Sequence, residues 1–412
     1  MKEEKRMILS MLEEGKITAD EAMELLEALD ETEANFTYDR TLEEEYIDKK
    51  EAIKKEIRKN AEEIRENVRK IEGFGANLGN LISNIVNNIV DKSISFNLNG
   101  LYETMSTKIE RDISSIENPV IDLEAINGNI NARSWDQDKI SMEITIKYRN
   151  KNFSSVNDFY NFYEEGNVLR FKPTHRSNLL ISLDVNLPNK YYEEVMLRTS
   201  NGKIKVNDLR LGKLMVKTSN GSITAEDISS KDINLSTQNG KIYLNHVSSP
   251  IIHGKTTNGS FLLQDINSEN LNISTINGKI RFTDINSESI CGKTSNSSIE
   301  LENASSKTVK LRTSNGSIIC KDIDKEEIRE LDLSTSNSSI NVDLDNTKKP
   351  KYFHLETSMG NISLDIPDLV YKVNSKDYAG FKKIIAHSVD FDEGKEYFLV
   401  KASTSNGSIK IK

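Results

Sequence analysis

Acidic side chains recur at one position of a repeated phrase, and such a row of carboxylates could bind calcium or supply acid and base catalysts. They lie 19 residues apart, at the same point after each copy of a Thr-Ser-Asn-Gly motif. The position is occupied by Asp208, Asp227, His246, Asp265, Asp284, Asn303 and Asp322. The chain lacks the glycine-rich nonapeptide of calcium-loaded β-rolls. We therefore interpret these residues as corner caps that bond to nearby backbone.

Other candidates for catalysis are sparse. The five histidines are scattered, and no nucleophile elbow, phosphate-binding glycine loop or Cys-x-x-Cys motif occurs. Cys320 falls on the inward parity of the repeat and Cys291 on the outward one, so we expect no disulfide between them. The sequence predicts no catalytic, metal-binding or cofactor-binding residue and favours a non-enzymatic protein. A carbohydrate-active β-helix lyase or hydrolase, and a surface adhesin, stay open as alternatives.

The repeat itself predicts the architecture that positions these residues. Seven copies begin at Thr199 and recur every 19 residues to Thr313, and further copies begin at Thr335, Thr357 and Thr404. After each motif apolar residues alternate with polar ones, as in Ile204 and Val206, which is the pattern of a strand with one buried face. We expect a mainly β protein whose core is a single-chain, right-handed parallel β-helix with two strands and two corners per coil.

The Asn-Gly pair is expected to turn the chain, because both residues accept a positive φ. In a stack of equal coils the asparagines lie above one another, so each side-chain amide can bond to the next in a ladder. The ladder residues are Asn201, Asn220, Asn239, Asn258, Asn277, Asn296 and Asn315.

Helical patterns precede the repeats. Residues 1–32 predict a helical hairpin, with a capping box at Thr18-Ala19-Asp20-Glu21 opening the second helix. Residues 33–116 predict a region of charged and amphipathic helices, and residues 117–412 the β-solenoid domain. Two excursions from the repeat, at 131–198 and 366–403, are rich in aromatic residues and are expected to cover the solenoid ends.

One amphipathic helix is a candidate contact site. Residues 77–91 place apolar side chains on one face, and the polar face contains Asn and Ser with hardly any Lys. This face indicates a partner protein, a second copy of the chain, or peripheral membrane contact. The candidate contact residues are Leu78, Leu81, Ile82, Ile85 and Ile89.

Charge is unevenly distributed along the chain. Residues 1–72 carry 14 basic and 22 acidic side chains, whereas the remainder carries 41 basic and 42 acidic ones. We therefore expect no nucleic-acid binding and no phosphate-binding stripe in the β region. Neither a secretory signal nor an apolar run long enough for a membrane span is present, so we expect a cytoplasmic protein with peripheral membrane contact.

Two parts of the chain resemble known families. The segment from Leu183-Asp184-Val185-Asn186-Leu187-Pro188 to Thr199-Ser200-Asn201-Gly202 resembles the bacterial adhesin-like β-strand-repeat family. The opening segment, Met11-Leu12-Glu13-Glu14-Gly15-Lys16-Ile17-Thr18, is similar to the SHOCT-like helical domain at the head of YvlB and LiaX proteins. These resemblances imply a non-enzymatic regulatory or scaffold protein linked to the cell-envelope stress response of Gram-positive bacteria, with a protein or envelope component as partner.

Overall fold

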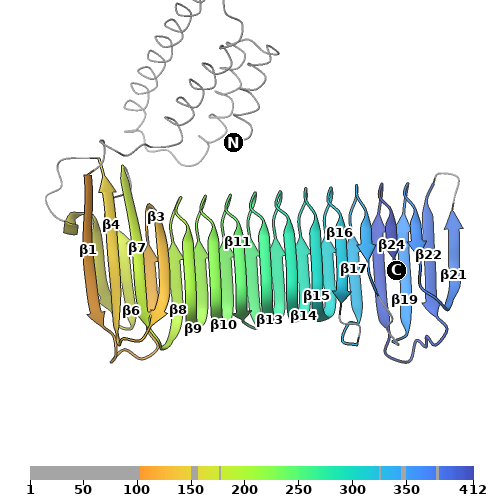
Figure 1. The fold of residues 1–412 in the computed structure, drawn as a ribbon, viewed down its shortest axis with the longest axis horizontal. Coiled ribbons are helices and arrows are strands. Elements are labelled where there is room, and N and C mark those ends of the chain that lie inside the picture. Colours follow the sequence, from red (N-terminus) through yellow and green to blue (C-terminus); the bar gives the residue numbers. More distant parts are fainter. Residues whose placement is uncertain (1–102, 150–155, 176–177, 324–325, 345–348, 377–379) are drawn as a thin grey trace, which may run out of the picture. The chain divides into compact units, whose positions relative to one another are not determined.

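A computed structural model describes residues 103–149, 156–175, 178–323, 326–344, 349–376 and 380–412. The predicted helical hairpin at 1–32 and the amphipathic helix at 77–91 lie outside these residues. The described chain folds into an elongated stack of coils made from one 24-stranded sheet (Figure 1). The predicted β-solenoid is therefore confirmed. The described part of the chain contains no helix with the length and apolar character needed to cross a bilayer.

The regular coils are long strands that pair in parallel with the next coil. Ile223 of one coil aligns with Ile204 of the coil before it and with Ile242 of the coil after it, so the 19-residue period is the register. The strands of this region are β9 (Ile204–Lys217), β10 (Ile223–Ser236), β11 (Ile242–Ser248), β12 (Ile251–Lys255), β13 (Phe261–Ser274), β14 (Ile280–Lys293), β15 (Ile299–Arg312), β16 (Ile318–Ile323), β17 (Glu330–Ser334) and β18 (Ile340–Val342).

Most regular coils contain one 14-residue strand rather than the two short strands expected. The strand bends sharply at the acidic position, where Asp208 has φ of 55° and Asp227 of 56°. Asp and Asn tolerate a left-handed conformation better than other non-glycine residues, which explains why they recur at this bend. Between β11 and β12 the strand is interrupted near Pro250, which lacks an N–H for the ladder.

The core is built from three inward pairs per coil. In β9 these are Ile204 with Val206, Leu209 with Leu211, and Leu214 with Val216, all at most 2% exposed. In later coils a serine replaces Leu211, and Ser230, Ser249, Ser268, Ser287 and Ser306 are buried. Ser230 Oγ donates to the Asp232 carbonyl at 3.0 Å, so this serine stabilises a second bend of the strand, at residues 230–232.

At the N-terminal end, spatial order departs from chain order. The coil formed by β2 (Val120–Glu124) and β3 (Asn127–Trp135) lies between two later coils. On one side are β6 (Val168–Pro173) and β7 (Leu179–Pro188), and on the other are β8 (Tyr191–Arg198) and β9. The end is then covered by antiparallel strands: β4 (Lys139–Tyr148) pairs with β7, and β1 (Glu103–Asp112) pairs with β4. A short 3-10 helix, η2 (Val156–Asp158), precedes β5 (Tyr160–Glu165), which pairs with β6.

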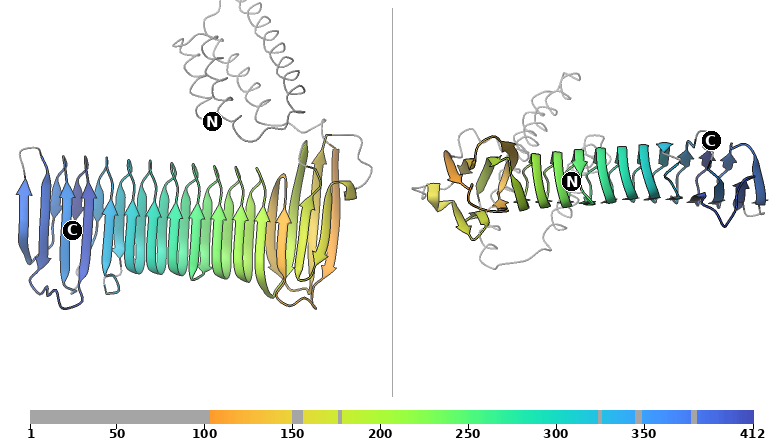
Figure 2. Two further views of the ribbon diagram at one scale, coloured as in Figure 1. Left: turned by 180° about the vertical axis from the view of Figure 1, so that it is seen from behind. Right: turned by 90° about the horizontal axis from the view of Figure 1, so that it is seen from below.

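The C-terminal end repeats this insertion. The coil of β23 (Phe398–Thr404) and β24 (Ile409–Ile411) lies between β17–β18 and the coil of β19 (Lys351–Thr357) and β20 (Ile362–Leu364). Beyond β19, the strands β22 (Lys382–Ser388) and β21 (Leu369–Lys376) add antiparallel cover at the end of the stack (Figure 1). Figure 2 shows the stack from behind and from below. The segments 131–198 and 366–403 therefore supply end strands together with parts of internal coils.

Candidate binding surfaces

The asparagines of the repeat form a continuous ladder along one edge. The Nδ2 of Asn239 donates to Oδ1 of Asn220 at 2.6 Å, and Asn258 donates in the same way to Asn239. Equivalent bonds link Asn201, Asn220, Asn277, Asn296 and Asn315 to their preceding neighbours. The row continues through Asn337 and Asn406. Each of these asparagines is exposed to solvent, and its side-chain amide is hydrogen-bonded to an asparagine of the adjacent coil.

Successive turns approach closely at the glycines of the motif. A Cβ added to Gly240 or Gly259 would lie 1.7 Å from the carbonyl oxygen of the glycine one coil earlier. Thr256 Oγ1 lies in the same crowded turn, where it donates to the Gly240 carbonyl and accepts from the Gly259 N–H. The expectation that Asn-Gly turns through positive φ is wrong for the regular turns from Asn201 to Asn315, where neither residue has a left-handed φ; in the upstream copy Asn127 has a φ of 56°.

The acidic column lies at the bend opposite these turns, where its residues have a positive φ, as in Asp265 and Asp284. His246 Nε2 is 3.0 Å from Asp265 Oδ2, and Asn303 Nδ2 donates at 2.5 Å to Asp284 Oδ1, so neighbours in the column bond to one another. Over the described ranges, no three His, Cys, Asp or Glu side chains gather in a way that could hold a metal ion.

Cys320 is a buried core residue with a free thiol. Burial raises the pKa of this thiol to about 12.

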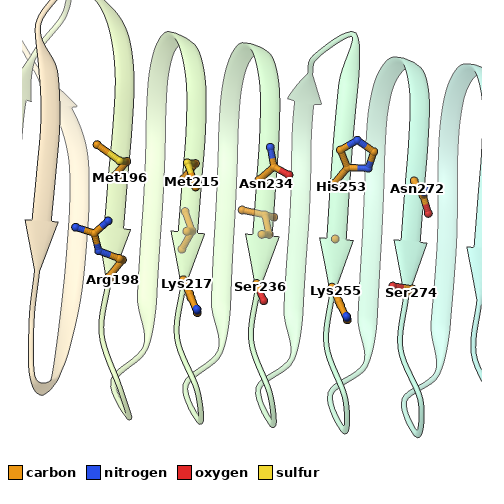
Figure 3. A pocket seen from close by; sticks show the side chains of 13 residues that line it. Met196, Arg198, Met215, Lys217, Asn234, Ser236, His253, Lys255, Asn272 and Ser274 are labelled. Carbon is orange, nitrogen blue, oxygen red and sulfur yellow. The ribbon is translucent and has the colours of Figure 1, made fainter.

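A hollow of about 420 Å³ crosses five coils on the sheet face that leads into the turns (Figure 3). Its lining combines thioether, amide, imidazole and cationic groups: Met196, Arg198, Met215, Lys217, Asn234, Ser236, His253, Lys255, Asn272 and Ser274 are its outward residues. No carboxylate lines it. Such a surface suits binding of an anionic or amphipathic group, whereas glycoside hydrolysis requires a pair of carboxylates.

This hollow could not be recognised from the net charge of the β region, which is close to zero. Its outward residues are contributed one pair per coil, so they are 19 residues apart in the chain. A useful signal was present in the spacing of lysines: Lys217, Lys255 and Lys293 are separated by 38 residues, or two coils. The candidate contact residues Leu78, Leu81, Ile82, Ile85 and Ile89 lie outside the described residues.

Comparison with known proteins agrees with both resemblances. The profile of the SHOCT-like domain matches residues 3–34, and that of Toastrack DUF4097 matches residues 120–260 and 251–412. YvlB of Bacillus subtilis (strain 168) is 27% identical over 223 residues, which are 51% of this chain and 56% of YvlB. The match therefore spans little more than half the length of that relative.

Solved structures of low sequence identity also align. A candidate adhesin from Parabacteroides distasonis is 10% identical, with a TM-score of 0.33 over 75% of this chain and 97% of that chain. A candidate adhesin from Bacteroides fragilis is 11% identical, with a TM-score of 0.27 over 75% and 97% of the two chains. Because two adjoining Toastrack matches cover most of the sequence, from residue 120 to its last residue, the chain belongs to the Toastrack DUF4097 family.

Proposed function

We propose that this protein is a non-enzymatic binding scaffold of the bacterial cell-envelope stress response. The observation that carries the proposal is the joining of a SHOCT-like domain at 3–34 to a Toastrack solenoid at 120–412 in one chain. The relative YvlB supports the assignment to this type of protein. In this proposal the solenoid binds a protein or envelope component, and the segment before it, including 77–91, relays that binding or joins copies of the chain.

The geometry of the solenoid supports binding rather than turnover. Parallel pairing holds outward side chains of successive coils in register, as Met215 with Asn234 and Asn234 with His253, so each sheet face offers a fixed row of contacts. A row of this kind can bind an extended partner without rearrangement, which lowers the entropic cost of association.

A genetic complementation experiment tests the proposal. A strain lacking the gene is given either the full chain or a chain lacking residues 1–97, which keeps β1 in place. A stress-responsive promoter is then followed after exposure to a membrane-active peptide. We expect the full chain alone to restore the normal response, with both proteins at equal abundance. An identical promoter response in all strains would contradict the proposal.

A separate assay addresses the enzymatic alternative. Purified full-length protein is incubated with pectic and peptidoglycan-type polymers, and release of reducing ends or unsaturated products is measured. We expect no product above the level of a heat-inactivated sample. Saturable turnover by the native protein would replace the scaffold proposal with a carbohydrate-active one.

A further inference from the structure

The turns that connect the coils carry positive charge and no negative charge. Eight consecutive six-residue turn segments, from 198–203 to 334–339, contain eight basic residues and neither Asp nor Glu. The basic residues are Arg198, Lys203, Lys217, Lys241, Lys255, Lys279, Lys293 and Arg312. We call this row of turns the cationic edge. The turns follow one long side of the stack (Figure 1), and the asparagine ladder runs through them.

The charges on the cationic edge follow a regular zigzag. Lys217, Lys255 and Lys293 directly precede the threonine of every second turn, whereas Lys241 and Lys279 directly follow the glycine of the turns between them. From the turn at 217 to the turn at 293, each coil thus contributes one cation, on alternate sides of the ladder. With a strand spacing of about 4.8 Å, the row from Arg198 to Arg312 is about 29 Å long.

Most of these charges have no internal partner. Arg198 pairs with Asp122, Lys279 with Glu300, and Arg312 with Asp332 at 2.8 Å. The other five, Lys203, Lys217, Lys241, Lys255 and Lys293, are exposed and make no ion pair with the described residues. Lys241 lies over the ring of Tyr243, at 5.9 Å from its centroid. Five like charges held along one edge therefore depend on water and external anions for compensation.

The opposite side of the coil has the reverse charge. There the bend positions carry Asp208, Asp227, Asp265, Asp284 and Asp322. The near-neutral total charge of the β region therefore hides a row of turns that has cations and no carboxylate. That total charge led to the prediction of no phosphate-binding stripe, and it does not reveal the cations gathered on this edge.

We propose that the cationic edge docks the solenoid lengthwise onto an anionic lipid bilayer. Charge complementarity supports a phosphate-bearing ligand, and a straight row of lysines on a rigid edge can contact a flat surface at every coil. The turn segments contain no aromatic side chain on which nucleic-acid bases could stack. Ile276 projects from the middle of the row and is 48% exposed, and such an apolar tip among cations suits a headgroup region better than a hydrophilic polymer.

This inference names the ligand of one edge of the proposed scaffold and rests on the proposed function only for its cellular setting. It concerns the solenoid, independently of the candidate contacts at 77–91. The two proposals can fail separately, because vesicle binding by purified protein does not depend on the stress response.

Vesicle co-sedimentation with the full-length protein tests the proposal. One variant carries Lys217→Gln, Lys241→Gln, Lys255→Gln and Lys293→Gln, which remove four unpaired charges from the edge. A matched control carries Lys172→Gln, Lys231→Gln, Lys321→Gln and Lys395→Gln, which remove the same charge elsewhere. Circular dichroism and thermal unfolding verify that both are folded. Vesicles contain equal parts of phosphatidylglycerol and phosphatidylcholine, or phosphatidylcholine alone, at about 0.1 M salt.

We expect the wild type and the control to bind the anionic vesicles and not the neutral ones. The edge variant should bind at least about 50-fold more weakly, since each lysine near an anionic surface contributes about fivefold. Equal binding by the edge and control variants, or no binding by the wild type, would overturn the proposal. The proposal would also be overturned if the wild type, but not the edge variant, bound soluble polyphosphate and neither protein bound anionic vesicles.

Discussion

Gly254 makes room for the ring of Phe261 one coil further along the stack. A Cβ on Gly254 would lie 2.6 Å from Phe261 Cε1 and 2.9 Å from Ile273 Cδ1. The neighbours of Gly254 in the same column are Leu235 and Ile273, so glycine is the exception in an apolar row. A related contact occurs at Gly292, where a Cβ would lie 3.0 Å from Cε2 of Phe282 in the same strand. Large and small residues thus alternate across the core to keep its volume constant.

Gly254→Val should destabilise the solenoid by about 1–3 kcal/mol, because the added methyl groups overlap the Phe261 ring. The double variant Gly254→Val with Phe261→Ile restores the residue types of the neighbouring coils and should recover most of that loss. Urea unfolding of the two single variants and the double variant measures the coupling. Additive losses, with no recovery in the double variant, would contradict this packing relationship.

Gly259→Ala should cost about 2–3 kcal/mol, because its Cβ would overlap the Gly240 carbonyl oxygen in the closest contact of the turn. Ser297 offers a matched control, since it occupies the glycine position of its own turn and already carries a Cβ. Ser297→Ala should therefore change the free energy of unfolding by less than about 0.5 kcal/mol. Chemical denaturation compares the two variants, and similar losses at both sites would refute the close-approach explanation.

Asp227 is predicted to be retained for its backbone conformation rather than for a ligand. Its φ is 56°, so Asp227→Ala should cost about 1 kcal/mol, whereas Asp227→Gly and Asp227→Asn should be nearly neutral. Thermal unfolding in the presence and absence of calcium measures both effects. A large stabilisation of the wild type by calcium that is lost in Asp227→Asn would show instead that the column binds metal.

Asn258 lies inside the ladder, where it donates to Asn239 and accepts from Asn277. Asn258→Ala should cost about 1–2 kcal/mol, because two amide groups lose a partner at an edge that water can reach. Asn258→Asp keeps the acceptor but loses the donor, so a smaller loss is expected. Equal stability of wild type and Asn258→Ala in urea would indicate that water replaces the ladder bonds without cost.

The local repeat could be predicted from the sequence, but the order of coils at the ends could not. The period of 19 follows from identical short motifs, and it sets the register in the structure. By contrast, β2 pairs with β6 and β8, so Ile121 aligns with Leu169 and Val195. Apolar alternation fixes which face of a strand is buried, but it does not select among several equally apolar partners far along the chain.

The site could be predicted only in part, for a related reason. The ladder asparagines recur in every regular coil, so their alignment follows directly from the period. The lysines of the cationic edge alternate between two positions of the motif, those of Lys217 and Lys241, and acidic residues elsewhere in the β region offset them in the total charge. The fold of each coil places these lysines and the aspartates of the opposite bend on different sides of the stack. The amino-acid composition does not predict this separation.

The inserted C-terminal coil should respond to pH through the ion pair between Glu330 and Lys401. Lys401 Nζ lies 2.9 Å from Glu330 Oε1 and joins β23 to β17. The hydrogen bond from Lys401 lowers the pKa of Glu330 below its ordinary value of 4.5, although partial burial opposes this. A lowered carboxyl pKa stabilises the fold above about pH 4.5, and that contribution is lost as the pH falls through the folded-state pKa.

Glu330→Gln should therefore be less stable than the wild type by about 0.5 kcal/mol at pH 7, a small value because both side chains are partly exposed. The difference should shrink toward zero as the pH falls to about 3, since protonated Glu330 no longer pairs with the lysine. Urea unfolding at several pH values measures this difference directly, and hydrogen exchange of the β23 amides locates it. A difference that stays constant from neutral to acid pH would assign the loss to packing and exclude the ion pair as its cause.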